Sequence, residues 1–274
     1  MNQTSAIGLD ETSFVKHKTK SHKDYATTVA DVEHHQIIDI ISSRNLVDIA
    51  RFINSQPESW RHRICYGALD MSASYAAVYT VTLPRVFQVV DPFHVVSLAN
   101  RALDQVRRRV QSETLGHRGR RDDPLYRIRR ALLVAEERLS DEAAERLRSL
   151  LELGDPNAEV AIAYRIKERM RNFNRASDGA TTRELLGELV FHCTRDAMPP
   201  KIRKLGATLK RWFDKICNYH LSKVTNGPTE SINNLIKRNK RIGFGFRNFE
   251  NYRIRVLLYA GKPNWRVLNS IVVD

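Results

Sequence analysis

The first 110 residues alternate between strand-like and helix-like patterns of apolar positions. Short runs rich in Val, Ile and Thr indicate strands, and apolar residues three or four positions apart indicate helices. The predicted strands span residues 5–14, 24–33, 34–42, 63–72 and 85–91, and the predicted helices span residues 43–57, 72–84 and 92–110. The order β-β-β-α-β-α-β-α predicts an α/β (α+β) fold, in which a mixed five-stranded sheet carries helices on its faces.

Beyond this region the strand pattern stops. Residues 107–224 are highly charged and helical in pattern, with the clearest amphipathic runs at 123–153 and 159–176. A last amphipathic helix is predicted over 226–242, where Pro228 suits the first turn and either Asn226 or Thr229 can cap it. We therefore divide the chain into a first core segment (1–106), a large all-helical insertion (107–224) and a last core segment (225–274).

The net charge of the chain is more informative about its function than the overall composition is. The 274 residues are 42% hydrophobic and 28% charged, an ordinary globular balance, but the formal net charge is +14. Residues 201–266 hold 16 Lys and Arg and only three acidic residues, which points to a phosphate-rich partner such as nucleic acid. The exposed face of the last helix and the turn after it supply the candidate DNA contacts Lys237, Arg238, Lys240, Arg241 and Arg247.

Other compositional signals are weak. No apolar stretch approaches the ~20 residues of a membrane span, and no signal peptide is evident, so we expect a cytoplasmic protein without a membrane partner. The three cysteines, Cys65, Cys193 and Cys217, form no Cys-x-x-Cys pair. They are interpreted as buried thiols rather than as disulfide or zinc ligands.

Carboxylates stand at the ends of three predicted strands. Asp10 lies in "AIGLDET", Asp70 in "YGALDMS" and Asp91 in "VFQVVDPFH", while Glu230 lies in the first turn of the basic last helix. Each alone can be structural, and Asp91 before Pro92 can be an N-cap. Several carboxylates gathered in a basic protein instead favour a cation between them, and oxygen ligands suit Mg²⁺ or Mn²⁺. Such ions serve phosphodiester chemistry.

Four motifs in this order resemble the ISL-three family of insertion-sequence transposases, whose DDE catalytic domain is ribonuclease-H-like. They are "IGLDET", "ALDMSASY", "VVDPFHVVSLANRALDQVRR" and "NGPTESINNLIKRNKRIGFGFRNFENYRIRVLLYAG". The resemblance implies a catalytic and metal-binding triad of Asp10, Asp70 and Glu230, with Mg²⁺ or Mn²⁺ as cofactor. It implies metal-dependent cleavage and strand transfer of DNA, with transposon ends and target DNA as partners and a homo-oligomeric synaptic complex as a possible assembly.

Several points stay open in this comparison. Asp91 and His94 match an Asp-x-x-His signature and are expected beside the triad, although Asp91 competes with Asp70 as its second member and His94 can equally be a helix-face histidine. Trp212, in the helical insertion, is either a DNA contact or a buried aromatic residue. The "GFGF" motif at 243–246 is interpreted as a turn.

The family usually begins with a zinc-binding and helix-turn-helix region, and no counterpart precedes Asp10 in this sequence. We therefore expect a truncated catalytic part. The alternatives are a non-catalytic DNA-binding remnant and a metal-dependent nuclease on the same fold.

Overall fold

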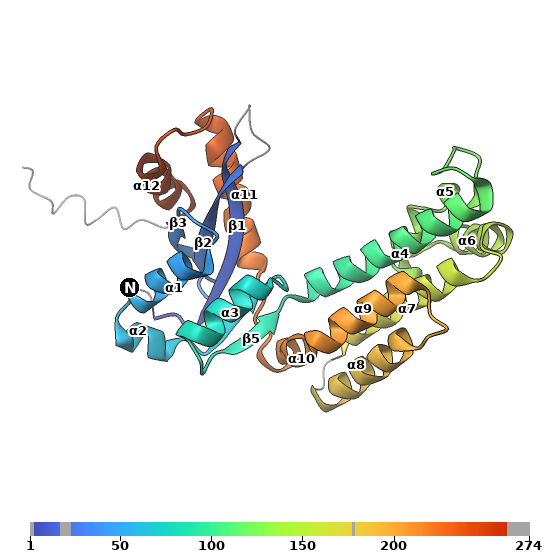
Figure 1. The fold of residues 1–274 in the computed structure, drawn as a ribbon, viewed down its shortest axis with the longest axis horizontal. Helices are drawn as coiled ribbons and strands as arrows, with labels where there is room; N and C mark the ends of the chain where they lie inside the picture. Colours follow the sequence, from blue (N-terminus) through green and yellow to red (C-terminus); the bar gives the residue numbers. More distant parts are fainter. Residues whose placement is uncertain (1–2, 17–22, 177–178, 262–274) are drawn as a thin grey trace, which may run out of the picture. The chain divides into compact units, whose positions relative to one another are not determined.

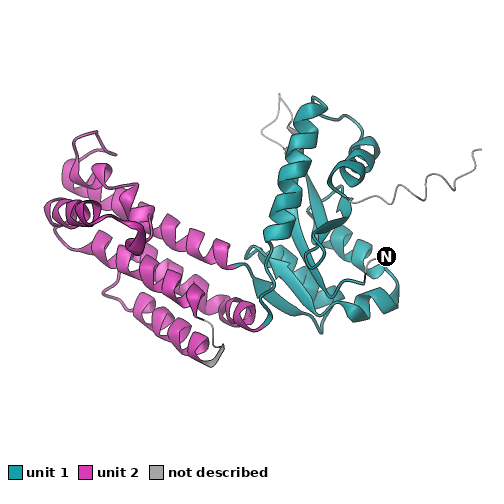
Figure 2. Ribbon diagram, turned by 180° about the vertical axis from the view of Figure 1, so that it is seen from behind, with its two compact units in different colours: residues 1–91, 222–274 teal, residues 92–221 magenta. Residues whose placement is uncertain are grey.

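The computed structural model of the chain describes residues 3–16, 23–176 and 179–261. They fall into two compact units, coloured separately in Figure 2. Unit 1 combines Met1–Asp91 with Ser222–Asp274, and unit 2 is the intervening Pro92–Leu221. The boundary expected after residue 106 falls inside a helix that begins at Pro92, and the units divide just before that helix.

Unit 1 is built on a five-stranded sheet with the strand order β3-β2-β1-β4-β5 (Figure 1). The strands are β1 (Ala6–Lys16), β2 (Lys23–Asp31), β3 (Gln36–Ile41), β4 (Tyr66–Leu69) and β5 (Phe87–Val90). The β1–β2 and β2–β3 pairs are antiparallel, whereas β4 runs parallel to both β1 and β5. This mixed sheet confirms the predicted fold class and is consistent with a ribonuclease-H-like fold.

Helices cover both faces of this sheet. They are α1 (Leu46–Asn54), α2 (Glu58–Arg63), α3 (Ala73–Thr82), α11 (Gly227–Ile242) and α12 (Phe249–Ala260). Neighbouring residues of β2 show the two faces, because successive side chains of a strand point in opposite directions. Thr27 lies beside Tyr75 of α3, whereas Thr28 donates to Asn233 of α11. Helices α3 and α11 therefore lie on opposite faces.

The α11 face holds a continuous apolar core. Phe14 of β1 and Ile40 of β3 pack with Ile232 and Ile236 of α11 and with Tyr252 of α12, and all five side chains are buried. The spacing of four between Ile232 and Ile236 places both on one stripe of α11. This packing fixes α11 along the sheet, so that the first turn of the helix lies over β1.

Unit 2 is helical throughout its described residues. Its main helices are α4 (Pro92–Leu115), α5 (Pro124–Arg127), α6 (Asp141–Gly154), α7 (Glu159–Arg175), α8 (Gly179–Thr194), α9 (Pro200–Arg211) and α10 (Phe213–Ser222), whose last residue belongs to unit 1. Helix α4 packs against α7 and α9, and α8 packs against α7 and α9. None of the helices in the described ranges is long and apolar enough to cross a membrane.

The amphipathic run at 123–153 is not one helix. After α5 the chain makes two short 3-10 turns, Ala131–Leu133 and Glu136–Arg138, before Ser140 caps α6. The break is stabilised from α7, where the fully buried Lys167 donates to the Val134 carbonyl at 2.8 Å. Helical periodicity alone did not reveal this interruption, because each fragment keeps the same apolar spacing.

Candidate active site

The strand register brings three aspartates to one face of the sheet. Gly8 of β1 pairs with Ala68 of β4, and Ala68 pairs with Val89 of β5. Two residues further along each strand come Asp10, Asp70 and Asp91. Since residues two apart share a face, all three side chains start from the face that α11 covers. Asp70 and Asp91 directly follow β4 and β5, as expected, whereas Asp10 lies inside β1, so the expectation of a strand end is wrong for Asp10.

Asp10 is the most strongly connected of these carboxylates. Its Oδ1 accepts the Glu11 backbone N–H and its Oδ2 accepts the Asn233 side-chain amide, both at 2.7 Å. Burial raises the pKa of Asp10 above its usual value, and the negative charges of Asp70 and Glu230 raise that pKa further, while the two hydrogen bonds lower it. Asp10 therefore lies within electrostatic range of both other triad candidates.

Asn233 connects two strands to α11. While its Nδ2 donates to Asp10, its Oδ1 accepts the Thr28 hydroxyl of β2 at 2.7 Å, and its side chain is buried. An asparagine has both a donor and an acceptor, so it can serve both partners at once. The sequence analysis did not select Asn233. Its position one helical turn after Glu230 was the available signal.

The first turn of α11 lies very close to β1. A Cβ atom added to Gly8 would lie 2.2 Å from the Thr229 hydroxyl and 2.6 Å from the Asn226 side-chain oxygen. Only a residue without a side chain permits this approach. The glycine of "IGLDET" thus has a packing role, which is to let the helix that carries Glu230 come near Asp10.

Asp91 holds the start of α11. Its Oδ2 accepts both the Thr225 hydroxyl and the Asn226 backbone N–H at 2.8 Å, and the side chain is buried. The predicted cap of α11 by its own side chains is wrong for Asn226, the N-cap residue, which makes no side-chain cap hydrogen bond. Asp91, directly after β5, instead accepts the backbone N–H of Asn226 itself, and it therefore fixes the start of the helix on which Glu230 lies.

The donor set of this region is compatible with a hard divalent cation. Asp70 Oδ1 is buried and has no hydrogen-bond partner among the described residues, so it retains the capacity to bind a cation. Asp10 would gain from such a cation, because its neighbours are carboxylates. Within the described ranges, however, no three His, Cys, Asp or Glu side chains are close enough together to hold a metal as they stand. For all three carboxylates to bind a metal, Glu230 must come closer to Asp10 and Asp70.

The remaining candidates have distinct environments. Lys237, Arg238, Arg241 and Arg247 are exposed, as a DNA contact requires. Lys240 differs, since its Nζ donates to the Ser13 carbonyl at 2.7 Å and burial lowers its pKa.

Three further predicted positions are described by the elements on which they lie. His94 lies in the first turn of α4, within unit 2, and is partly buried. Trp212 is buried in unit 2, which favours the interpretation as a core residue. The "GFGF" motif follows α11 as a turn, as expected, with Gly245 at a φ of 91°.

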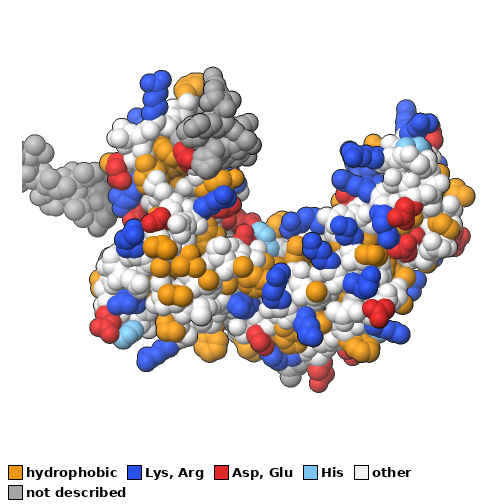
Figure 3. All heavy atoms as spheres, viewed as in Figure 1, with side chains coloured by type: hydrophobic (Ala, Val, Ile, Leu, Met, Phe, Trp, Pro, Cys, Tyr) orange, Lys and Arg blue, Asp and Glu red, His pale blue; other side chains and the backbone are white. Residues whose placement is uncertain are grey.

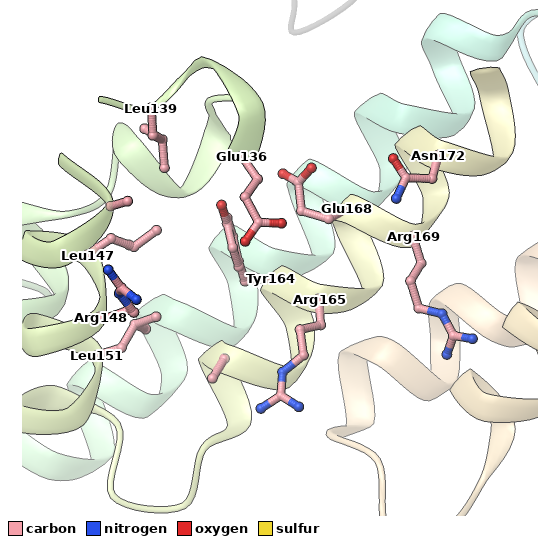
Figure 4. A pocket seen from close by; sticks show the side chains of 12 residues that line it. Glu136, Leu139, Leu147, Arg148, Leu151, Tyr164, Arg165, Glu168, Arg169 and Asn172 are labelled. Carbon is pink, nitrogen blue, oxygen red and sulfur yellow. The ribbon is translucent and has the colours of Figure 1, made fainter. Parts of the chain in front are cut away.

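A large cavity lies elsewhere. It occupies about 600 Å³ in unit 2, and Figure 4 shows its lining side chains, which come from α6, α7 and the turn before α6. Arg148, Arg165 and Arg169 contribute cations to the lining and Glu136 and Glu168 contribute carboxylates. All of these residues belong to unit 2, whereas the strand-end carboxylates belong to unit 1.

The mixed five-stranded sheet, with Asp10 inside β1, Asp70 and Asp91 directly after β4 and β5, and helices on both faces, is consistent with the ribonuclease-H-like class of protein. The family model for ISL-three transposases, described as "Transposase", matches residues 7–256 of this chain. The chain therefore belongs to the ISL-three transposase family, which confirms the resemblance inferred from the four motifs.

Curated relatives agree with this assignment. The chain is 28% identical over 265 residues to the transposase for insertion sequence element IS1557 of Mycobacterium tuberculosis, covering 88% of this chain and 57% of that protein. It is 26% identical over 254 residues to the transposase for IS1001 of Bordetella parapertussis, covering 91% and 59%. The chain thus spans less than three-fifths of the length of these relatives.

A shorter part of the chain matches a protein with a different name. The chain is 30% identical over 98 residues to an ATP-dependent protease of Lactococcus lactis, covering 36% of this chain and 27% of that protein. This partial match does not alter the family assignment.

Proposed function

We propose that this chain provides the catalytic core of a DDE transposase, which cleaves DNA and transfers strands in a reaction that depends on Mg²⁺ or Mn²⁺. The observation that carries the proposal is the hydrogen bond from Asn233 to Asp10, because it holds the helix that carries Glu230 against the strand that carries Asp10. Family membership supports DNA as the substrate.

Asp10, Asp70 and Glu230 are the proposed metal ligands. Bound ions would supply Lewis-acid activation of a water or a 3′-hydroxyl and would stabilise the leaving oxygen. The protein residues contribute position and charge. Asn233 orients Asp10, and Asp91 fixes the start of α11 and thereby Glu230. The buried, unpartnered Asp70 Oδ1 is the second ligand we favour, because the oxygen Oδ2 of Asp91 is already occupied by two donors.

Exposed cations on α11 are the proposed DNA contacts. Lys237, Arg238 and Arg241 lie on the helix that carries Glu230, and Arg247 follows it. Phosphate binding there would bring the backbone of DNA near an acidic site that repels it without metal. Lys240 is less suited to this role than the sequence suggested, because its ammonium group is engaged by β1.

The test is DNA cleavage by the Glu230→Gln variant beside the parent chain, with Mn²⁺ and with excess chelator. A Gln keeps the size of the side chain but removes its charge, so we expect cleavage to be abolished and DNA affinity to be equal or slightly higher. Chelator should stop the parent reaction. The matched control is Glu250→Gln, an exposed carboxylate in the first turn of α12, which should cleave at the parent rate.

Each outcome has a clear meaning. Cleavage at the parent rate by Glu230→Gln, or cleavage that survives chelation, contradicts the proposed mechanism. DNA binding without cleavage in the parent chain would favour the non-catalytic remnant. Cleavage without any joined product would favour the nuclease alternative.

A further inference from the structure

A basic groove runs along α4 in unit 2. Two hollows, of about 560 and 220 Å³, share Arg101 and Gln105, so they adjoin along α4 and are treated together as one depression. We call this depression the α4 groove. Its exposed or partly exposed cations are Arg101, Arg108, Arg129, Arg130, Lys201 and Lys204.

Figure 3 shows Lys and Arg side chains gathered over α4 and α9 in this unit. Most of these cations are not neutralised. Among the described residues that line the groove, Asp104 alone is acidic, and it pairs with Arg107 and Arg108 at 2.7 and 2.6 Å. Among the described residues, Arg101, Arg130, Lys201 and Lys204 have no carboxylate within ion-pair distance. The groove therefore has a strong positive potential that only an external anion can offset.

The distances between the cations suit a ligand that carries regularly spaced negative charges. Arg101 and Arg108 are two turns apart on one face of α4, roughly 10 Å along the helix. Lys201 and Lys204 flank them from α9 and are one turn apart. The separation of Arg101 and Arg108 along the helix corresponds to about three phosphate steps along one strand of a DNA duplex.

The side chain of Arg129 is already fixed in place by contacts within the protein. The guanidinium group of Arg129 lies 3.8 Å from the Tyr126 ring centroid, and its Nη1 donates to the Tyr126 carbonyl at 2.8 Å. An arginine fixed in this way loses less freedom when it meets a phosphate.

We propose that the α4 groove binds the phosphate backbone of duplex DNA without reading its bases. The choice of DNA among polyanions rests on the proposed function, but the groove belongs to unit 2, whereas the α11 cations belong to unit 1. Arginine and lysine suit a line of phosphates, and most of the cations of the groove have no carboxylate partner among the described residues.

The experiment compares two triple variants of the whole chain that lose the same charge. The groove variant is Arg101→Ala with Arg130→Ala and Lys204→Ala. The control variant is Arg138→Ala with Arg146→Ala and Arg165→Ala, which are exposed in unit 2 but outside the groove. Binding to a duplex of unrelated sequence is titrated by fluorescence anisotropy at several salt concentrations, and circular dichroism verifies folding.

Loss of three phosphate contacts should lower the log–log salt slope by about 2.7 and the affinity by up to about 100-fold at ~0.15 M salt. The control variant should change affinity by less than about 3-fold, because isolated charges away from the ligand are screened. An unchanged slope in the groove variant, or an equal loss in both variants, overturns the proposal. Failure of the catalytic proposal would instead appear in cleavage by Glu230→Gln, with DNA binding by the groove intact.

Discussion

The side-chain amide of Asn233 donates to Asp10 Oδ2 at 2.7 Å, although the two residues are 223 positions apart in the chain. The same asparagine accepts the Thr28 hydroxyl, so one side chain joins β1, β2 and α11. Because Glu230 lies one turn earlier on α11, the position of Asn233 also determines where that carboxylate faces the sheet.

Replacement of Asn233 by Ala should impair both stability and cleavage. The change leaves the buried Thr28 hydroxyl without its acceptor, which should lower the free energy of unfolding by about 1–3 kcal/mol in urea titrations. It also removes a hydrogen bond that lowers the pKa of Asp10, so that pKa should rise. Cleavage that requires ionised Asp10 should then fail at a higher pH on the acidic limb of the pH–rate profile.

The neighbouring residue offers a matched control for this variant. Asn234 is exposed on the same helix, so Asn234→Ala should leave both the unfolding free energy and the acidic limb unchanged. An acidic limb that does not move in Asn233→Ala would mean that Asn233 has only a structural role.

Metal-induced stabilisation should distinguish the two aspartates that competed for the triad. A ligand at 100 times its dissociation constant stabilises the folded state by about 2.7 kcal/mol, so saturating Mn²⁺ should raise the melting temperature of the parent chain. Asp70→Asn should lose most of this increase. Asp91→Asn should keep it, since an amide oxygen can still accept from Thr225 or Asn226. The reverse pattern would assign Asp91 to the metal.

The close approach of α11 to β1 predicts that Gly8→Ala is destabilising. The added methyl group would overlap the Thr229 hydroxyl, and relief of such overpacking typically costs about 1–3 kcal/mol. Gly187→Ala on α8 is the control, because its added Cβ meets nothing within 4 Å and alanine favours a helix by up to about 1 kcal/mol. Equal stabilities of the two variants would show that α11 does not press on β1.

Thiol labelling should report the packing of unit 2. Cys65 is exposed, whereas Cys193 and Cys217 are buried, and burial raises the pKa of Cys193 to about 12 and that of Cys217 to about 11. A maleimide at neutral pH should therefore label Cys65 alone in the native protein and all three thiols in urea. Mass spectrometry of peptides identifies the labelled sites, and rapid native labelling of Cys193 would contradict its packing. The exposure of Cys65 corrects the expectation that all three thiols are buried.

The sheet was predictable because each strand has a local signature of apolar and β-branched residues. The aspartates within β1 and directly after β4 and β5 were also visible, since each follows an apolar run. Their common face was not visible, because it depends on the register between strands. The role of Asp91 was hidden for the same reason: its partners Thr225 and Asn226 follow it by more than 130 residues.

The basic surfaces show the limit of a charge count along the chain. The segment 201–266 drew attention through its net charge, and the exposed cations of α11 fit that interpretation. The α4 groove instead combines residues from three separate stretches, around 101–108, 129–130 and 201–204, and two of these lie outside that segment. Lys240 shows the converse, since a cation in a basic run can serve the protein itself.

The long separation of Asp10 from Asn233 has a consequence during synthesis. At 5–20 residues per second, a ribosome adds the intervening 223 residues in about 11–45 s. Through that interval the nascent sheet lacks α11 and α12, and apolar side chains such as Phe14 and Ile40 remain uncovered. The carboxylates can therefore assemble only after α11 has been synthesised, so a product terminated before α11 would leave these apolar side chains uncovered and would lack Glu230.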